Sequence, residues 1–190
     1  AWDRAPGLYL AALRCWPLDP AVLGVLADMV SPGEALDQGE AWRAAREQLL
    51  VGVRFGLVIC PPPARHRCRV RLVRGLVQLG QPAEAVGLAR AGLAGLSAWE
   101  AAGELSAAEA EGQRGELLRD LAAAERQLGF PAEALELLER AERLPVASSE
   151  TRDQVTLERL RSLVALGRVD DACRLVADWT RQGGPTNLNG

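Results

Sequence analysis

The feature that most constrains the fold of this chain is a short turn sequence that occurs three times. QLGQPAEA at residues 78–85 returns at 127–134 as QLGFPAEA, and a looser copy, ALGRVDDA, occupies residues 165–172. The glycine of each copy stands where a helix ends in the left-handed conformation, which glycine adopts without steric cost. The acidic residue that follows falls in the first turn of a second helix, where it complements the helix dipole. Each copy therefore predicts the joint of a helical hairpin.

The segments around these joints have helical spacing of apolar residues. Aromatic residues make up only 4% of the chain, so the core depends on Leu, Ala and Val, and Ala and Leu are the strongest helix formers. We expect helices over about 64–79, 82–96, 131–144, from Ser148 or Ser149 to Leu166, and over 169–181. Residues 97–128 are expected to be mostly helical, with breaks at Gly103, Gly112 and Gly115.

The stretch before the first joint has two interpretations. Residues 51–59 alternate apolar and other residues as a strand does, yet three-and-four spacing begins upstream at Trp42. We favour a helix that ends at the prolines 61–63.

The joints resemble those of the tetratricopeptide repeat (TPR) family, whose repeat is a helix–turn–helix of about 34 residues. The family's Gly before the turn and its Ala at the start of the second helix match Gly80, Gly129 and Gly167 and Ala85, Ala134 and Ala172. A later small position matches Gly92 and Ala141 but holds Trp179 in the third copy, and the Trp, Leu-Gly and Tyr signature of the first helix is not kept. The resemblance implies an all-α fold of the divergent bacterial type, a right-handed superhelical array of antiparallel helix hairpins (a TPR-like α-solenoid).

The resemblance also divides the chain. It covers residues 64–182, where joint spacings of 49 and 38 residues predict longer helices than usual. Residues 1–63 resemble a degenerate helical repeat region, and residues 183–190 are expected to be a disordered tail. The opening lacks an initiator Met and has the pattern of mid-helix, which predicts a piece of a longer protein.

A cluster of arginines precedes the first joint. The window 48–83 has six arginines and no acidic residue, and on a helix Arg67, Arg71 and Arg74 form one stripe. The TPR resemblance implies that this stripe lines a concave groove and binds an acidic segment of a partner. The alternative is a solvated charged face, or pairing with acidic neighbours such as Glu100 or Glu104.

His66 is the only histidine and lies between Cys60 and Cys68. Zinc sites usually have four ligands at tighter spacing, and no fourth ligand is evident. We therefore expect no metal or other cofactor and a surface position for His66.

The sequence contains no catalytic pattern. It has no phosphate-binding glycine loop, no G-x-S-x-G and no H-E-x-x-H, and a Ser or Cys nucleophile lacks an oriented base. Its carboxylates are spaced for helix-stabilising pairs such as Glu136–Arg140 and Glu139–Arg143. We predict that the protein is not an enzyme.

Charge and cysteine usage exclude other classes. The formal net charge of −3 disfavours a nucleic-acid partner. The most apolar stretch, residues 49–60, contains Arg54 and is shorter than the roughly 20 residues that a membrane span needs. Four cysteines without framework spacing favour a reducing compartment. We expect a soluble, cytoplasmic protein without a membrane partner.

These observations predict a non-catalytic protein–protein interaction scaffold that presents a concave helical groove, with an acidic peptide segment as the partner that the arginines suit. The alternative is a supporting or sensing helical-repeat region of a larger multidomain bacterial protein, such as a transcriptional regulator or glycosyltransferase. A catalytic or DNA-binding domain in the same reading frame would favour that alternative.

Overall fold

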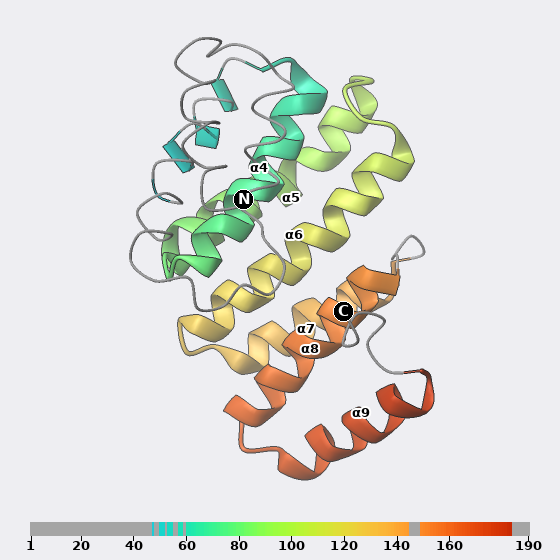
Figure 1. The fold of residues 1–190 in the computed structure, drawn as a ribbon. Coiled ribbons are helices and arrows are strands. Elements are labelled where there is room, and N and C mark those ends of the chain that lie inside the picture. The colour runs from blue at the N-terminus through green and yellow to red at the C-terminus, as the bar shows by residue number, and fades with distance from the viewer. Residues whose placement is uncertain are drawn as a thin grey trace, which may run out of the picture.

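The computed structural model describes residues 60–144 and 149–183, with isolated positions between 47 and 58, and every regular element in this part is a helix (Figure 1). The helices with described bounds are α4 (Pro62–Gln78), α5 (Pro82–Ala101), α6 (Ala107–Gln127), α7 (Pro131–Glu142), α8 (Ser149–Ala165) and α9 (Val169–Arg181). The all-α prediction is confirmed for these residues. The described positions between 47 and 58 are helical too, as the spacing from Trp42 predicts.

Two predictions fall on other residues. The degenerate repeat expected over residues 1–63 lies mostly outside the described residues, and so does the tail expected over 183–190. None of the helices that the structure describes is long and apolar enough to cross a membrane.

The repeated turns have the geometry that their sequence predicts. Gly80, Gly129 and Gly167 have φ angles of 71°, 92° and 70°. The residue after each glycine donates its N–H to a carbonyl five residues earlier at 2.9 Å, as the bond from Gln81 to Leu76 illustrates. This is the Schellman arrangement, which satisfies carbonyls at a helix end. The three copies therefore stop α4, α6 and α8 in the same way.

Each joint is followed by a close helix crossing. Pro82 and Pro131 stand at the start of α5 and α7, where the missing N–H costs no hydrogen bond. Ala85, Ala134 and Ala172, one turn further, are all buried. The pairs α4–α5, α6–α7 and α8–α9 are in contact, so the predicted hairpins are confirmed.

The middle of the chain differs from the prediction. Helix α5 extends beyond residue 96 to Ala101, and the chain then turns at Gly103, whose φ is 72°. A capping box between Ser106 and Glu109 starts α6. Helix α6 runs through Gly112 and Gly115, so the breaks expected there were wrong. An interior glycine costs about 1 kcal/mol relative to Ala, which is less than the packing of a buried helix supplies.

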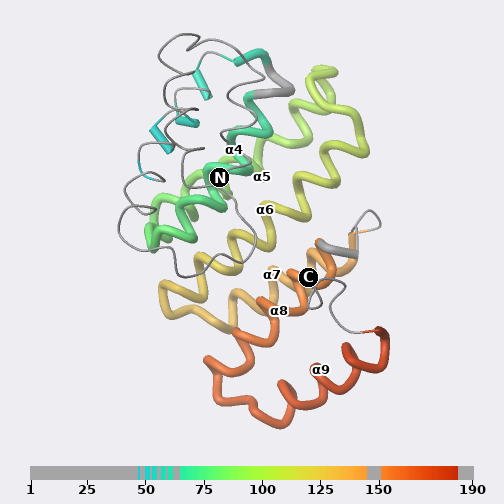
Figure 2. Tube along the Cα trace, viewed as in Figure 1, coloured from blue at the N-terminus to red at the C-terminus, as the bar shows by residue number. Residues whose placement is uncertain are grey.

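The hairpins follow one another from α4–α5 to α8–α9 (Figure 2). Each helix contacts the next one along the chain, and α4 also contacts α6, as α6 contacts α8. The first helices of the hairpins thus pack in succession. One apolar cluster joins α4, α5 and α6, and a second joins α6, α7 and α8.

Candidate functional site

The predicted arginine stripe does not form one uniformly exposed surface. Arg67 is exposed and Arg71 is half-buried. Arg74 is only 17% exposed, and its Nη2 lies 2.7 Å from Glu116 Oε2. Its Nε lies 3.3 Å from Asp120 Oδ2. The pairing alternative therefore holds for Arg74, with acidic partners on α6 instead of Glu100 or Glu104.

The charge of Arg74 is compensated within the fold. Burial acts to lower the pKa of the Arg74 guanidinium, but the Asp120 and Glu116 carboxylates outweigh it and the pKa is raised. A buried charge that is already paired has little to gain from a second acidic partner. Of the three arginines, Arg67 is the one with an exposed side chain.

A polar network continues from this pair toward the last hairpin. The buried Asp120 accepts hydrogen bonds from the buried Arg119 at 2.7 and 2.9 Å, and Arg119 also bonds to Gln154 on α8. Arg126 on α6 lies 3.2 Å from Glu158 on α8. These contacts link α4, α6 and α8 through their facing sides.

The surface position expected for His66 was wrong. His66 is 2% exposed, its ring stacks on Trp99 at 4.1 Å between centroids, and its Nε2 lies 2.9 Å from Glu104 Oε2. Arg69 approaches Nδ1 at 3.4 Å. Because an arginine only donates, Nδ1 must accept and Nε2 must carry the proton toward Glu104. This arrangement fits a neutral ring. Burial lowers the pKa of His66, Arg69 acts in the same direction, and Glu104 acts against them.

The two cysteines beside His66 are also buried. Burial raises the pKa of Cys68 to about 12, so this thiol is poorly nucleophilic. Among the described residues, no group of three or more His, Cys, Asp or Glu side chains is placed to hold a metal ion.

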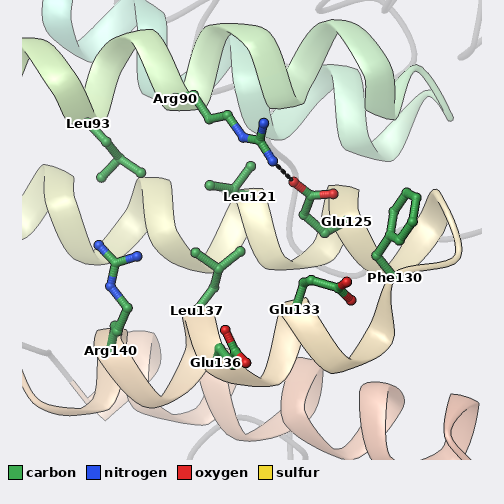
Figure 3. A pocket seen from close by; sticks show the side chains of 9 residues that line it. All are labelled: Arg90, Leu93, Leu121, Glu125, Phe130, Glu133, Glu136, Leu137 and Arg140. Atoms are coloured by element: carbon green, nitrogen blue, oxygen red, sulfur yellow. Dashed lines mark hydrogen bonds and ion pairs between the residues drawn. The ribbon is translucent and has the colours of Figure 1, made fainter.

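A groove lies between α5 and α7, with α6 as its floor (Figure 3). Its volume is about 540 Å³. Leu93, Leu121 and Leu137 come from the three helices. Leu121 and Leu137 lie near the middle, Leu93 lies toward one end, and Phe130 stands at the other end, near the second joint. Such a leucine-lined hollow with charged groups around it is suited to an apolar side chain of a partner.

The rim of the groove has mixed charge. Arg90 Nη2 lies 2.6 Å from Glu125 Oε1, which neutralises the one carboxylate near the floor. Glu133, Glu136 and Arg140 are exposed. The predicted Glu136–Arg140 pair was wrong, because no ion pair joins these two described side chains, whereas Glu139 and Arg143 do pair, at 3.6 Å. The rim therefore has free charges of both signs and a surplus of one carboxylate.

Sequence reasoning missed this groove for a physical reason. Its residues come from three helices and are spaced irregularly from residue 90 to 140, so no local pattern marks them. Comparisons of the chain with protein-family models, curated proteins and solved structures gave no match.

Proposed function

We propose that this chain is a non-catalytic protein-interaction scaffold, built as a right-handed TPR-like α-solenoid. Two observations support the solenoid: the joints share one geometry, and α4, α6 and α8 pack in succession. Stacked hairpins of this kind present extended surfaces on which partner segments lie.

The observation that carries the proposal is the groove between α5 and α7. Leu93, Leu121 and Leu137 line it and suit one or two large apolar side chains, and its free rim charges suit a polar flank. The surplus carboxylate does not favour an acidic segment here. We therefore propose an amphipathic segment of a partner protein as the ligand of this groove, and an acidic segment stays a hypothesis for the surface around Arg67.

The test compares the partners of three variants isolated from cells that naturally contain the protein. Leu137→Glu places a charge in the groove, and Leu135→Glu makes the same change at another half-buried position of α7 that does not line it. Arg67→Glu tests the arginine stripe. We expect Leu137→Glu to reduce specific partners at least about tenfold, which corresponds to the loss of one central contact.

Both leucine variants must show native helix content by circular dichroism. If Leu137→Glu retains the wild-type partners, the groove is not the binding site. Loss caused by Arg67→Glu alone would assign binding to the arginine stripe instead.

A further inference from the structure

The joints allow the hairpins to be compared position by position, with Gly80, Gly129 and Gly167 aligned. In the first two hairpins one face is covered by the first helix of the next hairpin: α6 packs on α4–α5, and α8 packs on α6–α7. No described helix packs on the corresponding face of α8–α9, which lies at the far end of the succession in Figure 1. Among the described helices, the last hairpin therefore has no covering helix on this face.

Direct contacts define the covered face. Arg74 on α4 pairs with carboxylates of α6, and both Arg119 and Arg126 on α6 bond to polar side chains of α8. In the joint alignment these positions correspond, in order, to Arg161, Leu157 and Val164 of α8. These three residues therefore belong to the face of α8 that a next first helix would contact.

Aligned residues are more exposed in the last hairpin than in the hairpins that have a covering helix. Val164 is 60% exposed, whereas its counterpart Val77 is 9% exposed. Val176 on α9 is 41% exposed, whereas its counterparts Ala89 and Leu138 are fully buried. The apolar counterpart of Val164 is thus buried in the first hairpin, and both counterparts of Val176 are buried. An apolar surface that is open where its counterparts are covered indicates an interaction site.

The open face has the chemistry of the first covered face. Along α4 the aligned residues are Val70, Val73, Arg74 and Val77, and along α8 they are Leu157, Leu160, Arg161 and Val164. Both series consist of three aliphatic residues with one arginine at the same place. The second hairpin differs, with Arg119, Ala122, Ala123 and Arg126. The helix that covers α4–α5, which is α6, is therefore the better guide to what fits α8–α9.

The positive charge on the open face indicates that the partner carries negative charge there. Arg74 is neutralised by two carboxylates of α6, Glu116 and Asp120. Its counterpart Arg161 is exposed and shares the single carboxylate of Glu158 with Arg126. Two guanidinium groups on one carboxylate leave a positive charge at the position where α6 supplies negative ones to α4.

Trp179 limits where a covering helix can lie on the last hairpin. At the position of Gly92, where a Cβ would lie 3.0 Å from Leu117 of α6, α9 carries the half-buried Trp179. Its indole Nε1 donates to Asp153 on α8 at 3.0 Å. A covering helix must therefore lie toward the joint, beside Val164 and Val176.

We propose that the face formed by α8 and α9 binds an amphipathic helix of a partner protein, seated along α8 as α6 is seated along α4 but shifted toward the joint, because Trp179 stands at the position of Gly92. This helix carries two carboxylates four residues apart beside an apolar stripe, as α6 carries Glu116 and Asp120 beside Leu117 and Leu121. The site is separate from the groove between α5 and α7 and does not depend on the function proposed for that groove.

The probe is a synthetic peptide of residues 106–128, which contains α6, labelled and added to the full chain in a fluorescence-anisotropy titration. We expect saturable binding that Val164→Asp weakens at least about tenfold. Val58→Asp is the matched control, since Val58 is equally apolar, is 75% exposed and lies at the other end of the described residues. Arg161→Glu should weaken binding as well, and a peptide with Glu116→Arg and Asp120→Arg should restore it.

The results that overturn the proposal are specific. Absence of saturable binding contradicts it, and so does binding that Val164→Asp leaves unchanged or that Val58→Asp weakens equally. Sedimentation of the chain alone tests whether a second copy of the chain covers this face instead. A homodimer that Val164→Asp dissociates would show that a second copy, not a foreign helix, covers this face.

Discussion

The first and last hairpins share a joint but differ in their surroundings. Helices α4 and α8 end at glycines with nearly equal φ angles, 71° at Gly80 and 70° at Gly167, and each is followed by a buried Ala at the crossing. Yet Val77 is buried and its counterpart Val164 is exposed. The joint is thus determined by the local sequence, whereas burial of the same face is determined by the next hairpin. Substitutions in aligned positions can separate these two contributions.

The largest effect is expected in the core of the first hairpin. Leu76→Ala removes a fully buried side chain and should lower the free energy of unfolding by about 2–5 kcal/mol. The aligned Leu163→Ala should cost about 2 kcal/mol, the lower end of that range, because fewer atoms cover the last hairpin. Equilibrium urea unfolding followed by circular dichroism measures both.

Val164→Ala serves as the control for this pair. Its side chain is exposed, so the free energy of unfolding should change by no more than about 0.5 kcal/mol. A greater loss from Leu163→Ala than from Leu76→Ala would contradict the expectation that the core of the first hairpin is more completely covered than that of the last.

The joints should respond alike in both hairpins. Gly80→Ala and Gly167→Ala each force an L-residue into the left-handed region, at a cost of about 1–2 kcal/mol. Because this strain is local, the two losses in urea unfolding should agree within about 0.5 kcal/mol. Gly112→Ala is the opposite control: this helical glycine has open space around its Cβ position, and the change should stabilise by about 0.5–1 kcal/mol. Clearly unequal costs at the two joints would show that their geometry depends on tertiary contacts.

The same division explains what the sequence could predict. The turn residues predicted the joints and the hairpin partners because Gly, Pro and Ala act there through local sterics. Helical spacing placed Arg67, Arg71 and Arg74 on one helix, but it could not show that Arg74 has its acidic partners 42 and 46 residues away. At Gly112 the local sequence gave a wrong prediction: glycine favours a helix break, but the packing of α6 outweighs this preference and the helix continues. The groove between α5 and α7 depends on distances between helices, which no short pattern contains.

The smallest effect concerns His66, which has no counterpart in the last hairpin because the chain has no other histidine. Burial lowers the pKa of His66 below that of an unfolded chain, so the unfolded state binds the proton more readily. The stability contributed by the neutral ring is present above pH 6.5 and should be lost as the pH falls below about 6.5, toward the lower folded pKa. His66→Gln keeps a hydrogen-bond donor for Glu104 without titrating, so its unfolding free energy should change less between pH 7 and 5. Urea unfolding of both proteins at matched pH values measures the difference. Parallel pH profiles would show that His66 is not buried as a neutral ring, and a steeper profile for the variant would reverse the sign assigned to the shift.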